Sequence, residues 1–245
     1  PCDRHGPPPR CTPSATRRRG CFWQTAAAGP ILCGMRSAMA PLYASLASLY
    51  SGGAIPACQR WAVDRVPVGA RVLFVGPGPG TDVVRAAQAG LQVTAIDHDP
   101  AMLAAVARRL CRAGAGRRVE LIQADLLQRA PTVRYDVVIA QFFLNVFSAA
   151  RLPGVVDHLA AHLLPGGRLL TGDFGGQPTG RLQQAYHDLP MHLFARLGAN
   201  AVHGVHDLPA CLRDRGFTIR QRRRFRLFRL GPGWIEGLDA EASRI

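Results

Sequence analysis

Short apolar runs and longer periodic segments alternate along this chain. The apolar runs lack a helical period, which predicts strands buried on both faces of a sheet. In the longer segments, apolar residues recur every three or four positions, which predicts amphipathic helices. We expect strands at 72–75, 91–96, 119–123, 136–140 and 168–173, and helices at 55–66, 83–89, 102–113 and 152–164. This alternation predicts an α/β fold with helices on both faces of a mostly parallel sheet.

The pattern changes after Gly175. Residues 176–207 form a long polar insertion, in which we expect a helix at about 182–197. A further helix is predicted at 208–215, where Gly216 ends it. Residues 217–238 then predict two strands around a Gly-Pro-Gly turn, which we interpret as an antiparallel hairpin at the sheet edge.

The first 34 residues differ from the rest of the chain. They contain three consecutive prolines, three consecutive arginines and no periodic apolar face, so we expect a disordered leader over 1–34 and one domain over 35–245. The low acidic content is compatible with a targeting peptide. The first methionine is Met35, so we favour the explanation that these residues are upstream sequence or part of a longer product.

Net charge, cysteine content and the lengths of apolar runs bear on which partners and which cellular location we expect. The net charge is +14, but all 30 basic residues are arginine, which we attribute to coding bias rather than to a phosphate-binding surface. We therefore expect no nucleic-acid partner. Seven scattered cysteines without paired spacing predict reduced thiols and a cytoplasmic location. No apolar run reaches the 18 or so residues of a membrane span.

A glycine-rich turn follows the first predicted strand. It reads Gly76-Pro77-Gly78-Pro79-Gly80, and a helix opens directly after it. A strand, a glycine turn and a helix N-terminus together let the backbone approach a ligand closely. The dinucleotide-binding spacing G-x-G-x-x-G needs a third glycine at position 81, where the chain has Thr81. The turn therefore predicts a ligand site that differs from the usual dinucleotide site.

Polar residues also end the next three predicted strands. Asp97 is placed to accept hydrogen bonds from a ribose diol, and Asp125 to accept one from an adenine amino group. Gln141 and Phe142 end the fourth strand, where they would face the reacting end of the ligand. Taken singly, a glycine turn can be only a tight connection and a strand-end aspartate only a helix cap. Four such features on consecutive strands favour a binding site.

These motifs resemble those of the class I S-adenosylmethionine-dependent methyltransferases. The similarity lies in Val-Leu-Phe-Val-Gly-Pro-Gly-Pro-Gly at 72–80 and Thr-Ala-Ile-Asp-His-Asp-Pro-Ala-Met-Leu at 94–103. Three later motifs follow in the family's order: Gln-Ala-Asp-Leu at 123–126, Asp-Val-Val-Ile at 136–139 and Leu-Pro-Gly-Gly-Arg-Leu-Leu at 164–170. The stretch from Tyr43 to Tyr50 is similar to the leader of quinone-biosynthesis-type members that act on small molecules.

The resemblance implies both a fold and a cofactor. The fold is a Rossmann-like three-layer sandwich, in which the seven-stranded, mostly parallel sheet has the order 3-2-1-4-5-7-6 and a C-terminal antiparallel hairpin. The cofactor is S-adenosyl-L-methionine, whose methyl group passes to a small-molecule acceptor by in-line displacement. The residues implied in cofactor binding are Gly76, Pro77, Gly78, Gly80, Asp97, His98, Met102, Asp125, Leu126 and Gln141.

Acceptor specificity is expected in two segments that can vary without disturbing the sheet, at about 41–66 and 176–207. Tyr43 and His187 are the catalytic candidates there, although the chain reveals no definite general base. The four histidines of the insertion can be solvated or packing residues, acceptor contacts or a base, or metal ligands, and we expect no metal.

Two other classes remain open. The first is a nicotinamide-dependent oxidoreductase, in which Asp97 would serve a ribose equally well. The second is an RNA or protein methyltransferase, or a nucleic-acid-binding domain, on the same fold. The arginines of 220–229 bear on this second class, and we interpret them as the solvated face of an edge strand.

Overall fold

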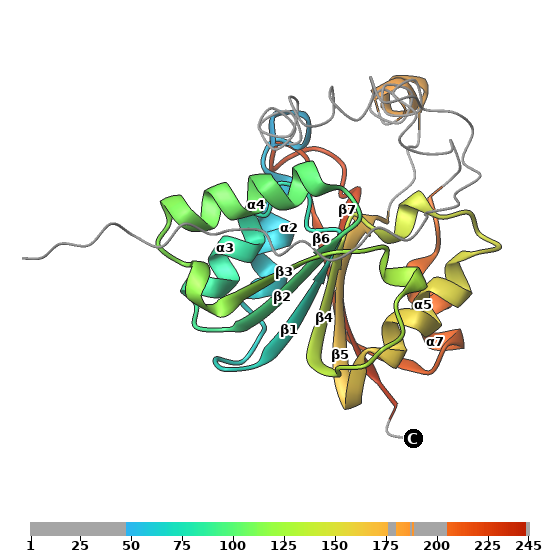
Figure 1. Ribbon diagram of the computed structural model, residues 1–245. Helices are drawn as coiled ribbons and strands as arrows, with labels where there is room; N and C mark the ends of the chain where they lie inside the picture. Colours follow the sequence, from blue (N-terminus) through green and yellow to red (C-terminus); the bar gives the residue numbers. More distant parts are fainter. Residues whose placement is uncertain (1–47, 176–179, 187, 189–204, 244–245) are drawn as a thin grey trace, which may run out of the picture.

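The computed structural model describes residues 48–175, 180–186, 188 and 205–243. A seven-stranded sheet forms its centre, in the order β3-β2-β1-β4-β5-β7-β6, as predicted (Figure 1). The strands are β1 (Arg71–Val75), β2 (Gln92–Asp97), β3 (Val119–Gln123), β4 (Tyr135–Gln141), β5 (Leu163–Phe174), β6 (Phe217–Phe225) and β7 (Ile235–Ala242). Only β7 runs antiparallel to its neighbours, which confirms the C-terminal antiparallel hairpin.

Helices cover both faces of the sheet and complete the three layers (Figure 1). One face carries α2 (Ala54–Val63), α3 (Thr81–Gln88) and α4 (Pro100–Arg112), and the other carries α5 (Leu152–Ala161) and α7 (Leu208–Asp214). Short 3₁₀ turns are η1 (Gly116–Arg118), η2 (Leu126–Gln128) and η3 (Leu144–Val146). Each face buries its own hydrophobic cluster, because successive side chains of a strand point to opposite faces. The strands are apolar on both faces for this reason.

Some predicted boundaries were wrong. The helix expected to reach residue 164 ends at Ala161, and Leu163 already pairs with Tyr135 in the sheet. The last strand runs on to Ala242 rather than ending at 238. Asp239, beyond the predicted end, is 5% exposed and lies 3.0 Å from the Arg168 guanidinium. A buried carboxylate needs such a partner, and only the folded sheet supplies it.

The two segments expected on the acceptor side are described in part. Segment 41–66 is helical at 48–51, turns at Gly52 and Gly53, and continues into α2. The insertion is helical at 181–186, while the rest of the helix expected there lies outside the described residues. Tyr50 and Tyr186 join the two segments, because their rings stack with centroids 4.8 Å apart.

A close approach between α2 and β7 depends on a glycine. A Cβ atom added at Gly237 would lie 2.7 Å from Cζ3 of Trp61, which is 6% exposed and rigidly packed. The same helix buries Cys58 against β5, where a Cβ at Gly172 would lie 2.5 Å from its Sγ atom. The two glycines therefore let α2 lie close against the sheet.

We expect Gly237→Ala to lower the free energy of unfolding by about 1–3 kcal/mol, because the added methyl overlaps an indole ring that has no room to move. The control is Gly154→Ala in α5, where the added methyl meets nothing within 4 Å. That change should raise stability by about 0.5–1 kcal/mol through helix propensity. Urea unfolding of both variants tests this, and equal effects would contradict the packing argument.

Candidate functional site

The glycine turn between β1 and α3 has three left-handed glycines, each with a different neighbour. Their φ angles are 57° at Gly76, 53° at Gly78 and 73° at Gly80. A Cβ at Gly80 would lie 2.6 Å from Val106 of α4, and one at Gly76 would lie 3.0 Å from the Phe143 ring. A Cβ at Gly78 would meet nothing within 4 Å. Gly80 and Gly76 thus let Val106 and Phe143 pack against the turn, whereas Gly78 borders open space that a ligand can enter.

Asp97 ends β2 with its carboxylate held beside the turn. It is 8% exposed, and its Oδ1 accepts a hydrogen bond of 2.9 Å from the Asp99 backbone N–H. Burial raises the pKa of Asp97 above its ordinary value. The neighbouring His98 side chain is 75% exposed, with Nδ1 3.5 Å from Asp97 Oδ1. Asp97 is therefore a fixed, poorly hydrated acceptor, while His98 faces solvent.

Asp125 follows β3 and combines a local role with an unused oxygen. Its Oδ1 accepts from the Leu127 N–H at 3.0 Å and so caps η2. Its Oδ2 is buried and has no hydrogen-bond partner among the described residues. The helix-cap alternative is thus correct for one oxygen, and the other is left for a ligand. Leu126 is buried in the core and Met102 is half-buried in α4.

Gln141 ends β4 and is 8% exposed. Its Oε1 lies 3.9 Å from the Cys58 Sγ atom, which donates to it. Its Nε2 is buried without a partner in the described part of the chain. A buried amide donor is costly to leave unpaired, so its position at a strand end indicates a binding site. The next residue, Phe142, adopts a left-handed φ of 54°, which redirects the chain at this edge.

Backbone hydrogen bonds link the strand ends to one another. The N–H of Gly76 donates to Ile96 O at 2.9 Å, and that of Ala124 donates to Asp97 O at 3.1 Å. These bonds continue the parallel register beyond the strands, so the turn, Asp97 and Asp125 lie along one edge. Gln141 continues the row because β4 pairs with β1. The catalytic candidates Tyr43 and His187 lie outside the described residues.

Two buried carboxylates were missed by the sequence analysis. Asp82, in the first turn of α3, is 5% exposed, and burial raises its pKa to about 6. Asp173, at the end of β5, is 2% exposed, and burial raises its pKa to about 6 as well. Asp173 accepts from the backbone N–H and the Nδ2 of Asn145, at 3.0 and 2.7 Å, and so holds η3 in place. The strand-end position that singled out Asp97 would also have found Asp173.

The arginines of β6 are less available than the sequence suggested. β6 is the edge strand, as predicted, but residues 220–224 are exposed on both faces rather than one. Arg222 and Arg224 pair with the buried Glu236, with N–O distances of 2.6 and 3.2 Å. Arg220 pairs with Glu241. Carboxylates of β7 therefore offset much of this charge.

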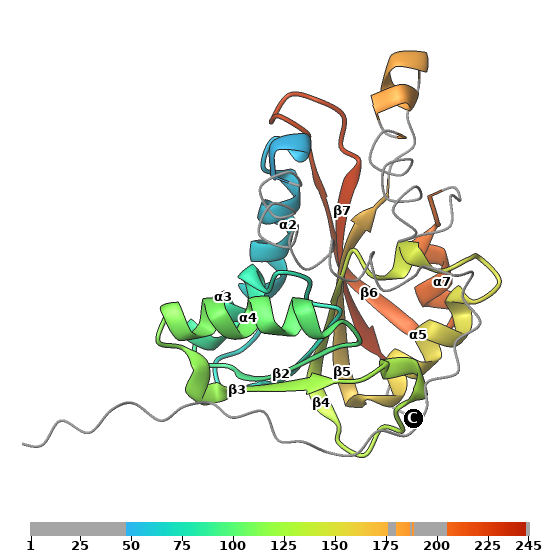
Figure 2. The same ribbon diagram turned by 45° about the horizontal axis from the view of Figure 1, so that its top comes forward.

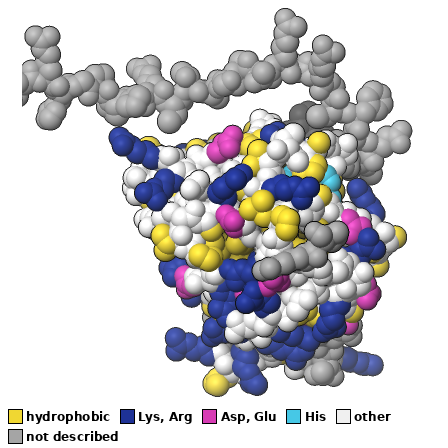
Figure 3. Space-filling model, turned by 90° about the horizontal axis from the view of Figure 1, so that it is seen from below, with side chains coloured by type: hydrophobic (Ala, Val, Ile, Leu, Met, Phe, Trp, Pro, Cys, Tyr) yellow, Lys and Arg dark blue, Asp and Glu magenta, His cyan; other side chains and the backbone are white. Residues whose placement is uncertain are grey.

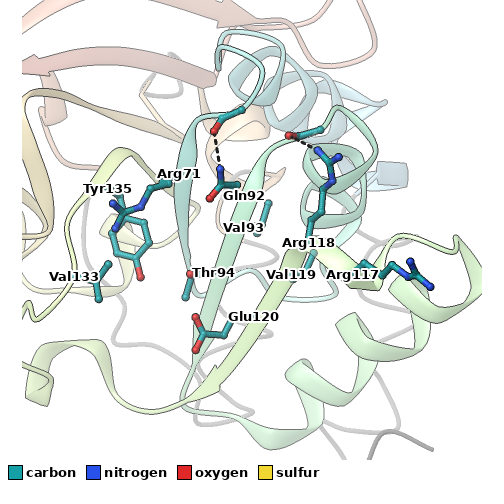
Figure 4. Close-up of a pocket in the computed structure, with 12 residues that line it drawn as sticks. Arg71, Gln92, Val93, Thr94, Arg117, Arg118, Val119, Glu120, Val133 and Tyr135 are labelled. Atoms are coloured by element: carbon teal, nitrogen blue, oxygen red, sulfur yellow. Dashed lines mark hydrogen bonds between the residues drawn. The ribbon is translucent and has the colours of Figure 1, made fainter. Parts of the chain in front are cut away.

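A shallow cavity of about 730 Å³ lies at the opposite end of the sheet (Figure 4). It is lined by the amino ends of β1, β2, β3 and β4, on an end of the molecule where arginine side chains are spread (Figure 3). Its polar groups serve the nearby backbone, since Arg118 donates to Gly90 O and Gln92 to Gly69 O. No lining residue has a buried polar side-chain atom without a partner. The carboxyl ends of the strands are therefore the better candidate.

Within the described part of the chain, no group of three His, Cys, Asp or Glu side chains is arranged to hold a metal ion. Over the same residues, no helix has the length and apolar character needed to cross a membrane.

Comparison with known proteins now gives the family. Residues 73–169 match the family model described as "Methyltransferase domain", a span that includes the glycine turn, Asp97, Asp125 and Gln141. This stretch of the chain is similar to a methyltransferase domain. This confirms the family resemblance seen in the motifs, but it does not test the quinone-biosynthesis-type subclass.

Relatives of known activity match part of the methyltransferase chain. Ribosomal protein L11 methyltransferase of Symbiobacterium thermophilum is 32% identical over 114 residues, which is 46% of this chain and 35% of that protein. The enzyme of the same name from Pelotomaculum thermopropionicum is also 32% identical, with the same coverage. The chain thus spans about a third of the length of the curated relatives it matches.

Solved structures show the same fold. The 1,6-didemethyltoxoflavin-N1-methyltransferase of Burkholderia thailandensis, solved with 1,6-didemethyltoxoflavin and S-adenosylhomocysteine, superposes with a TM-score of 0.61 at 19% identity, covering 90% of this chain and 93% of that one. Magnesium protoporphyrin IX methyltransferase of Synechocystis, solved with S-adenosylhomocysteine, has a TM-score of 0.58 at 22% identity, covering 77% and 82%. At these identities the likeness establishes the fold.

Asp82 gives the methyltransferase domain a measurable pH dependence. Because burial raises its pKa from 3.8 to about 6, the folded protein binds more protons than the unfolded chain between about pH 4 and pH 6. The free energy of unfolding therefore falls as pH rises through this window. In Asp82→Asn we expect this fall to be smaller by on the order of 2 kcal/mol.

Urea unfolding at pH 4 and pH 7 measures the difference. The matched control is Asp214→Asn, which replaces an exposed carboxylate of α7 and should keep the wild-type pH dependence. A fall in Asp82→Asn as large as in the wild type would show that Asp82 is not the group responsible.

Proposed function

We propose that this protein binds S-adenosyl-L-methionine at the carboxyl ends of β1 to β4 and transfers its methyl group to a small organic acceptor. The observation that carries the proposal is a row of unused groups along this edge. Gly78 borders open space, Asp125 Oδ2 lacks a donor and Gln141 Nε2 lacks an acceptor. These groups lie at the ends of β1, β3 and β4 along one edge of the sheet, which suits one elongated ligand.

The residues fit the chemistry of this cofactor. Gly78 lets the backbone pass beneath the ligand, and Asp97 is a fixed acceptor for ribose hydroxyls. Asp125 Oδ2 suits the adenine amino group, and Gln141 would lie toward the sulfonium and the amino-acid end. We propose Pro77, His98, Met102 and Leu126 as further walls of this site. Asp97 lies at the end of β2 next to the β1 turn, as a ribose between the two would require.

When bound, the cofactor supplies a methyl group attached to a sulfonium sulfur. The neutral thioether that remains after transfer is a good leaving group. The protein then has to align the methyl with the nucleophile and exclude water. Asp173 contributes by holding Asn145, and with it the turn after β4, against the end of β5. This clamp fixes the backbone beside which the reacting atoms would meet.

An aromatic surface at the same edge supports a small organic acceptor. The rings of Phe142 and Phe174 meet edge to face with centroids 6.1 Å apart. The rings of Tyr186 and Trp234 are tilted to each other, with centroids 6.2 Å apart. Tyr50, whose ring stacks on that of Tyr186, continues this surface into segment 41–66. We propose that segments 41–66 and 176–207 form the acceptor side, since Tyr50 and Tyr186 already join their described parts. Such rings favour a flat, partly apolar acceptor.

A protein acceptor is the second candidate, because the curated relatives methylate ribosomal protein L11 by name. That similarity covers about a third of those proteins. An assay with labelled donor, offered either a panel of phenols, quinones, amines and carboxylates or purified ribosomal proteins, separates the two. A cytoplasmic location is part of the proposal, since the described cysteines Cys58, Cys111 and Cys211 are all free thiols.

The donor site is tested by Asp97→Ala. Calorimetric titration should show wild-type binding of S-adenosylmethionine and S-adenosylhomocysteine but not of NAD. The variant should lose about 1–3 kcal/mol of binding free energy, because the ribose hydroxyls lose their acceptor. Asp64→Ala, which removes an exposed carboxylate at the C-terminal end of α2, is the control. Tight binding of NAD instead would favour the oxidoreductase alternative.

The acceptor side is tested by Tyr186→Ala, using an acceptor found in the panel. We expect the KM for the acceptor to rise about tenfold, since a stacked ring is lost, while the Kd for S-adenosylmethionine changes less than twofold. Tyr186→Phe keeps the ring and should restore the KM. Equal losses of donor and acceptor binding would assign Tyr186 to the fold rather than to the acceptor side.

A further inference from the structure

The turn between β6 and β7 presents apolar side chains to solvent. Residues 226–233 read Arg-Leu-Phe-Arg-Leu-Gly-Pro-Gly. Within this turn Leu227 is buried, whereas Leu230 is 90% exposed and Phe228 is 56% exposed. Turns are ordinarily built from small or polar residues, so two large apolar side chains at an exposed tip need a reason.

The backbone holds this tip in a defined shape. Phe228 and Arg229 adopt left-handed φ angles of 49° and 65°, a conformation that costs energy in residues other than glycine. The Phe228 N–H donates to Ser51 O at 3.4 Å, and Gly231 N–H donates to Leu227 O at 2.7 Å. A Cβ at Gly52 would lie 2.5 Å from the Phe228 backbone nitrogen, so the tip is packed against the turn at Gly52 and Gly53. The backbone that carries the exposed Phe228 and Leu230 side chains is therefore held in place.

A third apolar side chain lies beside the tip. Leu49, two residues before Ser51, is 73% exposed. Figures 1 and 2 show the β6–β7 turn next to the N-terminal end of α2, and in Figure 2 the turn projects at one end of the molecule. Leu49, Phe228 and Leu230, which we call the apolar tip, thus come from two chain segments that meet there.

The charge around the apolar tip is positive. Arg226 and Arg229 are exposed, and no acidic side chain among the described residues forms an ion pair with either. Farther down β6 the situation differs, because Arg222 and Arg224 share an ion pair with Glu236. The turn itself contains no aspartate or glutamate. Exposed apolar groups between unpaired arginines are suited to a surface that is anionic outside and apolar within.

We propose that the apolar tip binds the surface of an anionic lipid bilayer, with Phe228 and Leu230 inserted among the headgroups and Arg226 and Arg229 contacting lipid phosphates. Three side chains on a projecting turn cover far less than the 800 Å² or so that each partner contributes to a stable protein interface. Peripheral membrane binding needs only a few inserted apolar groups with basic neighbours. This inference does not depend on the proposed methyl transfer.

Co-sedimentation of the full chain with vesicles tests the proposal. We expect binding to vesicles of phosphatidylcholine with phosphatidylglycerol, weaker binding to phosphatidylcholine alone, and loss of binding as salt is raised. The double variant Phe228→Ser, Leu230→Ser should lower the partition coefficient about tenfold, because its apolar insertion is lost. The double variant Arg226→Gln, Arg229→Gln should lower it too, and should flatten its salt dependence.

The matched control is Val68→Ser, which removes an apolar side chain that is 82% exposed but lies before β1, away from the tip. It should bind vesicles like the wild type, and thermal unfolding checks that every variant folds. Wild-type binding that ignores lipid charge would overturn the proposal. So would tip variants that bind as well as the wild type, or a tip-dependent association with protein in place of vesicles.

Discussion

The approach of α4 to the glycine turn is the constraint on which the candidate site depends. Val106 packs where a side chain at Gly80 would otherwise stand, so α3 and α4 lie together above the ends of β1 and β2. This packing brings Asp97 and the start of α4 beside the turn. The hydrogen bond from Gly76 N–H to Ile96 O then ties the two strand ends together. With a larger residue at position 80, the row of polar groups would lose its alignment.

The polar groups at this edge are buried, and some of them lack hydrogen-bond partners that would replace the water they have lost. Asp82 and Asp173 are almost completely buried, and their raised pKa values measure the cost of holding a charge there. Asp173 recovers part of that cost from three donors, two of them on Asn145. Asp125 and Gln141 keep unpaired atoms. Such incomplete pairing is uncommon in a core and typical of a place that a ligand completes.

At the far edge of the sheet, the buried carboxylates of β7 are paired with arginines. β7 carries carboxylates that would be costly if unpaired, and arginines of β5 and β6 supply their partners, as in the pair of Arg168 and Asp239. The arginine-rich edge strand is therefore first a partner for β7. Beyond Phe225 no described acid pairs with Arg226 or Arg229, and there the arginines lie beside the exposed side chains of Phe228 and Leu230. The same residue type serves structure in the strand and is free for recognition in the turn.

The sequence by itself determined the parts that depend on local pattern. Apolar runs and helical periods determined the alternation of strands and helices, and the resemblance of the motifs to a known family implied the strand order. The turn at Gly76–Gly80 and the strand-end positions of Asp97, Asp125 and Gln141 were readable because parallel strands end at one edge. Other features were decided only by tertiary structure. Gly237 matters because Trp61 of a distant helix packs on it, and β7 extends past residue 238 because Arg168 neutralises Asp239. The burial of Asp82 likewise depends on what covers α3. In each case the deciding neighbour lies far away along the chain, where no local pattern records it.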